Sequence, residues 1–141
     1  MKLSSRAPVV LRLQRQEGLR RARAAARSLR AAFPSVQELR LDLKFEGPAS
    51  NAPATQTHEL HPPAPAFFEF PCPYADCDGR FDLTRVVESM LGSGGQHCEG
   101  LLECFGLRPG QGGSRQACGL RLRYQVRATC QQGVGPVPLH S

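Results

Sequence analysis

Tryptophan is absent from this chain of 141 residues, and tyrosine and methionine occur only twice each. Aromatic residues make up 6% of the sequence, so few large side chains are present to fill a core. A chain of this length is the size of one domain and can bury roughly two thirds of its unfolded surface. We therefore expect a further source of stability, and the six cysteines are the obvious candidates.

Long hydrophobic runs are also missing. No stretch approaches the roughly 20 apolar residues of a membrane-spanning helix, and the apolar patch from Ala7 to Leu11 is shorter than the core of a secretory signal. The arginine-rich beginning is similar to an organelle transit peptide, but its apolar stripe favours packing against the rest of the chain. We expect a cytoplasmic protein with reduced thiols.

Acidic residues are scarce in the first 40 residues, where ten lysines and arginines stand against Glu17 and Glu38. The net charge of +6 is therefore concentrated at one end of the chain. Residues 10–33 carry apolar side chains at steps of three and four, which predicts a helix that Pro34 ends. This stripe contains Leu19, Ala22, Ala26, Leu29 and Phe33.

Apolar and polar residues alternate over residues 39–46 and 118–130, which predicts two strands with one buried face each. Further expected elements are a loop at 48–57, an extended segment ending at Phe70, a short strand at 80–82, a helix at 83–91, and a strand at 100–106 that is joined to the last strand by the loop 107–117. Prolines 62, 63 and 65 place the start of the extended segment at a sheet edge or outside the sheet.

The expected fold class is α+β. It comprises an antiparallel sheet of about five strands stapled by a four-cysteine site that is like a zinc ribbon, with an arginine-rich N-terminal helix and a short second helix. We divide the chain into a basic helix at 1–35, the α+β domain at 36–130 and a disordered tail at 131–141.

Four cysteines lie where the chain turns. Cys72 and Cys77 belong to a turn rich in proline and glycine, and Cys104 and Cys118 stand at the base of the expected hairpin. Sulfurs from a turn and a hairpin can form a tetrahedral site, and Zn²⁺ is the ion that such thiolates favour. The sequence predicts one structural zinc ion, with Cys98, which follows His97, as the alternative third ligand. For Cys130 we expect a buried, inert thiol.

Two alternatives use the same cysteines. Three disulfides in an exported protein would need an export signal, which we do not find, whereas an iron–sulfur cluster accepts four thiolates as readily as zinc does. Other motifs are weaker. The histidines of His58-Glu59-Leu60-His61 are three apart where a zinc protease needs four, and Asp76, Asp78 and Asp82 do not have calcium-loop spacing. We find no catalytic constellation and expect no enzyme.

The segment Phe70-Pro71-Cys72-Pro73-Tyr74-Ala75-Asp76-Cys77-Asp78-Gly79-Arg80-Phe81-Asp82-Leu83, together with Cys104-Phe105-Gly106 and Cys118, resembles zinc-ribbon domains. More narrowly, it is similar to small uncharacterised bacterial proteins with a Cys-Pro-Tyr-x-Asp-Cys-x-Gly-x-Phe knuckle. The resemblance covers about residues 36–130, and it implies a metal-stapled antiparallel sheet with these four cysteines as ligands. It implies no activity. The C-x₄-C spacing departs from the usual C-x₂-C knuckle of a ribbon.

The basic residues indicate an anionic partner, of which nucleic acid is the commonest. A positive surface would combine arginines of the first helix and of the last strand: Arg20, Arg21, Arg23, Arg27, Arg121, Arg123 and Arg127. The alternative is a protein-interaction module or accessory subunit that binds no nucleic acid. Nothing in the sequence points to a membrane or to a small-molecule substrate.

Overall fold

The computed structural model describes residues 3–47, 55–74 and 76–131, with the backbone alone for residues 3–12. The fold is α+β. Its helices are α1 (Leu3–Ala25), α2 (Leu29–Ala32) and α3 (Thr84–Gly92). Its strands are β1 (Val36–Glu46), β2 (Thr55–Leu60), β3 (Glu69–Pro71), β4 (Arg80–Asp82), β5 (His97–Glu103), β6 (Leu107–Pro109), β7 (Arg115–Ala117) and β8 (Arg121–Cys130).

The main sheet is antiparallel and has four strands in the order β2-β1-β8-β5, one fewer than expected. The two strands predicted from alternation form its centre, where Leu41 of β1 lies opposite Val126 of β8. The other short strands pair locally instead of joining this sheet. β3 pairs with β4 across the cysteine-bearing turn, and β6 pairs with β7.

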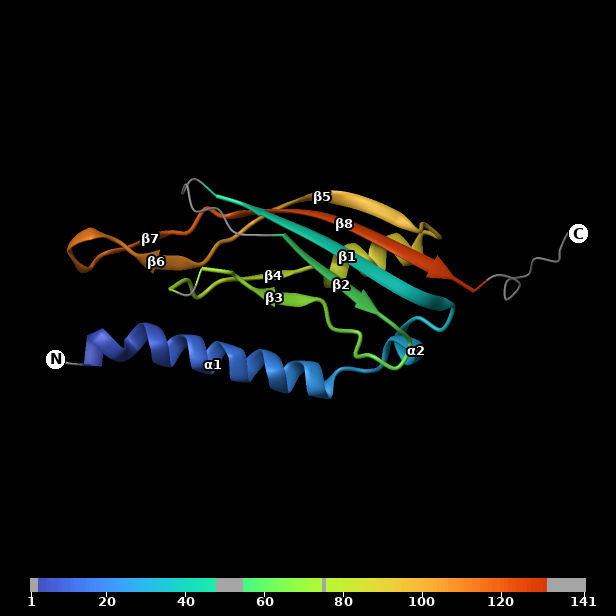
Figure 1. Cartoon of the computed structure of the whole chain (residues 1–141), viewed down its shortest axis with the longest axis horizontal. Coiled ribbons are helices and arrows are strands. Elements are labelled where there is room, and N and C mark those ends of the chain that lie inside the picture. The colour runs from blue at the N-terminus through green and yellow to red at the C-terminus, as the bar shows by residue number, and fades with distance from the viewer. Residues whose placement is uncertain (1–2, 48–54, 75, 132–141) are drawn as a thin grey trace, which may run out of the picture.

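The core lies on one face of the main sheet, against β3, β4 and α3 (Figure 1). Alternation places Leu39, Leu41 and Leu43 inward at 0–1% exposure, as predicted for β1. The few aromatic rings are used here, and the centroids of Phe45 and Phe81 lie 5.6 Å apart. The same buried cluster contains four of the six cysteines, so the fold brings these thiols to one end of its core.

The prediction of one continuous helix over residues 10–33 is wrong, because the helix is interrupted between α1 and α2. There the backbone bonds to the proline-rich segment after β2: Leu29 N–H donates to Ala64 O at 2.7 Å, and Ala66 N–H donates to Arg27 O at 2.7 Å. Ser28 then caps α2 by accepting a hydrogen bond from Ala31 N–H at 3.1 Å.

The apolar stripe of that helix is buried only in part. Leu19 and Leu29 are buried at 7% and 0% exposure, and Leu29 belongs to the main core cluster, whereas Ala22 is exposed. α1 lies on the far side of the β3–β4 pair from the main sheet (Figure 1). This layer order separates the arginines of α1 from those of β8.

Two predicted loops are shorter than expected. Residues 55–57 belong to β2, where Thr57 lies opposite Asp42, and residues 107–117 form the β6–β7 hairpin around a single 3₁₀ turn. Residues 48–54 and all but the first residue of the predicted tail lie outside the described part of the chain. None of the helices within that part is long and apolar enough to cross a membrane.

Candidate metal centre

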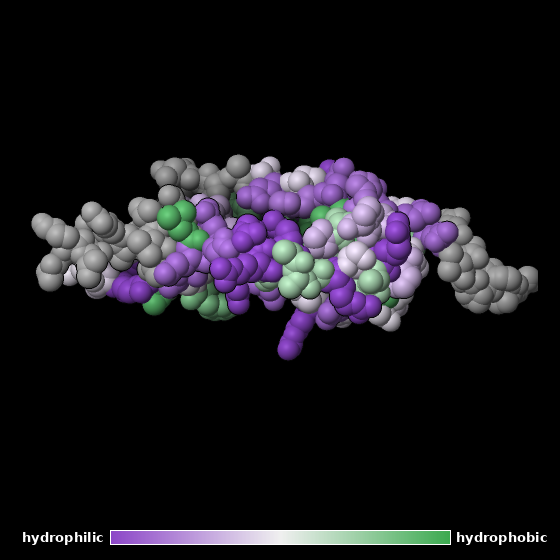
Figure 2. All heavy atoms as spheres, turned by 90° about the horizontal axis from the view of Figure 1, so that it is seen from below, coloured by the Kyte–Doolittle hydropathy of each residue, from purple (hydrophilic) through white to green (hydrophobic). Residues whose placement is uncertain are grey.

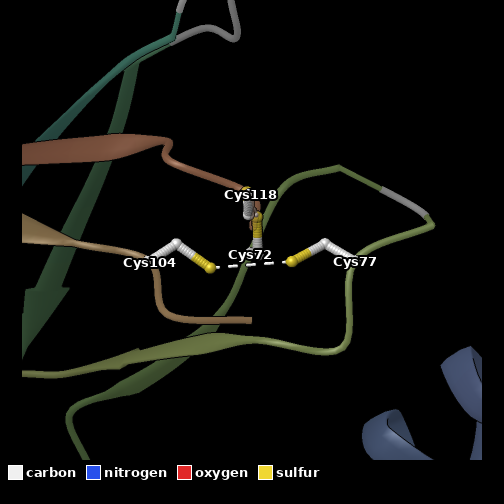
Figure 3. Close-up of side chains that lie close together, drawn as sticks. All are labelled: Cys72, Cys77, Cys104 and Cys118. Carbon is white, nitrogen blue, oxygen red and sulfur yellow. Dashed lines mark hydrogen bonds between the residues drawn. The ribbon is translucent and has the colours of Figure 1, made fainter. Parts of the chain in front are cut away.

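Four cysteine side chains point toward one another from three separate segments (Figure 3). Cys72 and Cys77 come from the turn between β3 and β4, Cys104 follows β5, and Cys118 precedes β8. All four are buried, and their Sγ atoms lie within 4.8 Å of one another. The Cys72 and Cys118 sulfurs are 3.8 Å apart, and those of Cys77 and Cys104 are 3.6 Å apart.

These distances fit one metal ion. In a tetrahedral site with metal–sulfur bonds of about 2.3 Å, neighbouring sulfurs lie about 3.8 Å apart. A disulfide would need about 2.05 Å, and all six cysteines are free thiols. The buried cluster could therefore hold a metal ion, and its donor set consists of sulfur alone.

The turn that carries the first two cysteines is closed by backbone hydrogen bonds. Cys72 N–H donates to Gly79 O at 3.0 Å, and Cys77 N–H donates to Tyr74 O at 3.2 Å. Gly79 N–H in turn donates to Cys77 Sγ at 3.3 Å. The loop thus presents a sulfur together with an N–H group that stabilises its thiolate form.

The second half of the cluster repeats this arrangement. Gly106 N–H donates to Cys104 Sγ at 3.4 Å, and Gly106 O accepts a hydrogen bond from Cys118 N–H at 3.0 Å. Cys77-Asp78-Gly79 and Cys104-Phe105-Gly106 are therefore two equivalent Cys-x-Gly knuckles. Gly79 and Gly106 also lie close together. We did not predict this contact from the sequence, although the repeated Cys-x-Gly spacing was a signal for it.

Burial controls the ionisation of these thiols. It raises the pKa of Cys72 and of Cys77 above the ordinary range, and it raises the pKa of Cys104 to about 12. Hydrogen bonds from the backbone of Tyr74, Gly79 and Gly106 act in the opposite direction. Thiolates in such a setting need a cation beside them.

Ion pairs attach the turn between β3 and β4 to the β6–β7 hairpin. Arg108 Nε lies 2.8 Å from Asp76, and the Arg108 guanidinium stacks 3.9 Å from the centroid of the Tyr74 ring. Arg115 lies 3.0 Å from Asp78. Asp76 and Asp78 therefore form ion pairs with the β6–β7 hairpin.

The remaining two cysteines lie away from the cluster. Cys98, the alternative third ligand, sits half-buried on β5 and lines a cavity of about 450 Å³ beside α3. Cys130 ends β8 and is half-buried, so it is more exposed than the inert core thiol we expected. The structure brings Cys104, and not Cys98, to the other three sulfurs.

The histidines of the His58–His61 segment lie on the edge strand β2 and its end. The centroids of the His58 and Phe70 rings lie 4.7 Å apart. His61 is exposed, and its ring lies within 4.8 Å of carboxylate oxygens of Glu38 and Glu59. Glu59 is 3.6 Å from Arg40, so this exposed group is part of a surface ion-pair network.

The arginines predicted to bind anions fall into two sets. Those of α1 and its C-terminal end, Arg20, Arg21, Arg23 and Arg27, are exposed, and Figure 2 shows a hydrophilic band on the face seen from below. Arg20 and Arg21 both pair with Glu17, at 2.5 Å and 2.9 Å. Those of β8, Arg121, Arg123 and Arg127, are exposed on the face of the main sheet that is turned away from the core.

No protein-family model matches this chain, and the searches of curated proteins and of solved structures found no match either.

Proposed function

We propose that this protein holds one structural zinc ion on Cys72, Cys77, Cys104 and Cys118. The observation that carries the proposal is the close approach of four buried sulfurs, with two pairs at 3.6 Å and 3.8 Å. The thin aromatic core supports it, since zinc bound in small modules contributes about 10–16 kcal/mol of apparent free energy. The ion would tie the β3–β4 turn to both ends of the β6–β7 hairpin, as in the zinc-ribbon domains that the sequence resembles.

A single ion suits the spacing better than a cluster. In a [4Fe–4S] cluster each cysteine binds a different iron, which spreads the sulfurs more widely than around one ion. Zinc is preferred to a single iron because it needs no redox partner. With four sulfurs bound, no position is open for water, and we therefore assign the site no catalytic role.

The test is elemental analysis of the purified chain together with a thiol titration in denaturant. The proposal predicts one zinc per chain and six reactive thiols after unfolding and chelation. Iron together with acid-labile sulfide would show an iron–sulfur cluster in place of zinc. Fewer than six thiols and no metal would show disulfides. Reduced thiols also fit the cytoplasmic location that forms part of this proposal.

We further propose that the two arginine sets bind an anionic partner, with nucleic acid as the first candidate. Exposed guanidinium groups on α1 and on the outer face of β8 support this, although Glu17 and Glu46 compensate some of their charge. The two sets lie in different layers, so each is a separate candidate surface. On duplex DNA, the logarithm of the affinity would fall by about 0.9 for each phosphate contact per tenfold rise in salt.

Two matched variants separate these surfaces. One replaces Arg20, Arg21 and Arg23 by glutamine, and the other replaces Arg121, Arg123 and Arg127. Binding of fluorescent single- and double-stranded oligonucleotides should weaken in one variant, with a shallower salt dependence. If the parent protein binds none of them at low salt, nucleic acid is excluded.

A protein partner is the second candidate, and one observation favours it. Phe105, in the second knuckle, is 86% exposed, and Leu107 beside it is 38% exposed. Exposed aromatic residues are frequent anchors of protein interfaces. Replacement of Phe105 by serine should then abolish an interaction that survives both arginine variants.

A further inference from the structure

One arginine of α1 reaches the metal centre. Arg15 Nη1 donates a hydrogen bond to Cys77 O and lies 3.4 Å from Gly79 O. Figure 3 shows part of α1 close to the loop that carries Cys77. The first helix is thus attached to the backbone of a knuckle that lies 62 residues away in the sequence.

The same short segment takes part in both sets of contacts. Gly79 N–H donates to Cys77 Sγ at 3.3 Å, and Gly79 O accepts from Cys72 N–H at 3.0 Å. The guanidinium of Arg15 also contacts Gly79 O and donates to Cys77 O. Any change that moves this segment therefore moves a candidate ligand and a helix contact together.

Arg15 is half-buried, and among the described residues only backbone carbonyl oxygens face its guanidinium. Its Nε is buried without a hydrogen-bond partner among the described residues, and no carboxylate of these residues lies within ion-pair distance of it. By contrast, Arg108 and Arg115 near the same turn are paired with aspartates. Burying an unpaired charge costs free energy unless an opposite charge lies close by.

The metal centre would supply that opposite charge. Four thiolates and one divalent cation leave two uncompensated negative charges in a buried site. A guanidinium on the adjacent carbonyl groups offsets part of this charge and fixes the peptides that orient the sulfur. A metal-loaded site would thus supply an opposite charge near Arg15, which neutral thiols do not supply.

Over residues 13–25, the part of α1 whose side chains the structure describes, few other contacts hold the helix in place. Leu19 is buried at 7% exposure, and the Arg23 guanidinium lies 5.2 Å from the centroid of the Phe67 ring. In proteins most of the stability of a helix comes from packing of one face, so the structure of α1 depends on its docking. The contact of Arg15 with the Cys77 knuckle can make the docking of α1 depend on the metal centre.

We propose that Arg15 is a positioning residue that couples metal binding at the Cys77 knuckle to docking of α1. This inference rests on the zinc site proposed above. Coupling between two binding equilibria is reciprocal: if the metal centre strengthens docking of α1, docking strengthens metal binding by the same factor. Loss of the metal would then release a basic helix from the β3–β4 pair.

The experiment compares the parent chain with Arg15→Gln, Arg15→Lys and the matched control Arg30→Gln, which changes an exposed arginine of α2. Zinc affinity is measured by competition with a chromophoric chelator, and docking is measured by hydrogen exchange of the amides of residues 13–25. Removal of such an outer contact typically weakens metal binding 10–100-fold, and we expect Arg15→Gln to fall in that range with faster exchange in the zinc-loaded protein. Arg15→Lys, which keeps the charge, should recover part of the affinity, and Arg30→Gln should match the parent.

The outcomes separate this inference from the proposed function. A zinc-loaded parent whose Arg15→Gln variant matches Arg30→Gln in both measurements would overturn the coupling and leave the zinc site intact. An Arg15→Lys variant that binds no tighter than Arg15→Gln would overturn the role of the charge. A parent that binds no zinc would overturn both proposals.

Discussion

Gly79 and Gly106 lie against each other across the cysteine cluster. A Cβ atom added to Gly106 would come within 2.8 Å of Cys77 Sγ, and one added to Gly79 would come within 3.0 Å of the Gly106 Cα atom. Each glycine also donates its N–H to the sulfur of its own knuckle. The two knuckles therefore approach closely only because neither glycine has a side chain.

Alanine at either position should separate the knuckles. Gly79→Ala and Gly106→Ala place a methyl group where backbone and sulfur atoms lie, and overpacking of this kind typically costs about 1–3 kcal/mol. We expect a lower unfolding midpoint and weaker zinc binding, measured by chemical denaturation and chelator competition. Gly18→Ala in α1 is the control, since nothing lies within 4 Å of the added atom and alanine favours a helix by about 0.5–1 kcal/mol. Equal stabilities for all three variants would contradict the packing of the knuckles.

The cysteines divide into two classes that substitution can distinguish. Cys118→Ser should lose the zinc ion and the cooperative thermal transition, because a metal contribution of about 10–16 kcal/mol exceeds the net stability of most domains. Cys98→Ser, which changes a half-buried cysteine outside the cluster, should keep one zinc and a transition close to that of the parent. Circular dichroism melting with metal analysis measures both. A Cys118→Ser protein that melts like Cys98→Ser would remove Cys118 from the ligand set.

Leu29 links the second helix to the core. Its side chain is fully buried at 0% exposure within the main cluster, and truncation of such a leucine costs about 2–5 kcal/mol. Leu29→Ala should therefore lower the free energy of unfolding by this amount in urea denaturation. Leu13→Ala, at a position of α1 that is 55% exposed, should change it by no more than about 0.5 kcal/mol. Similar effects in the two variants would mean that α2 does not pack as described.

His58 should titrate below the ordinary range of histidine. Burial lowers its pKa, and the nearby charge of Arg23 lowers it further. The unfolded chain takes up this proton near pH 6.5, whereas the folded chain takes it up only at lower pH. The contribution to stability is complete above about pH 6.5 and is lost as pH falls through the folded pKa.

Nuclear magnetic resonance of the histidine rings measures this directly. Arg23→Gln should raise the pKa of His58, and Arg21→Gln should leave it where it is in the parent. A His58 ring that titrates above pH 6.5 in the parent protein would contradict the lowered pKa.

The sequence pattern of a single segment predicted those strands whose burial imposes a pattern on their own residues. The alternation in residues 39–46 and 118–130 identified β1 and β8, because a half-buried strand imposes a period of two on its own sequence. The count of strands in the sheet was wrong because β3 and β4 pair with each other and do not join the main sheet. The break before Leu29 was missed because the backbone of residues 27–29 bonds to segment 64–66 and not to the preceding helical turn. The spacing of apolar residues in a helix does not depend on such a distant partner.

The cysteine cluster was accessible from sequence for a similar reason. Cys72 and Cys77 share one turn, and Cys104 and Cys118 flank one hairpin, so only a single long-range contact had to be inferred. The role of Arg15 was not accessible, since the helical pattern marks it only as one more polar position. Its contact with Cys77 exists only once α1 has folded against the β3–β4 pair.

X-ray absorption at the zinc edge of the purified protein identifies the atoms bound to the metal. We predict four sulfur neighbours at about 2.3 Å and no bound nitrogen or oxygen. A shell with two or three sulfurs completed by nitrogen or oxygen would contradict a centre made of Cys72, Cys77, Cys104 and Cys118.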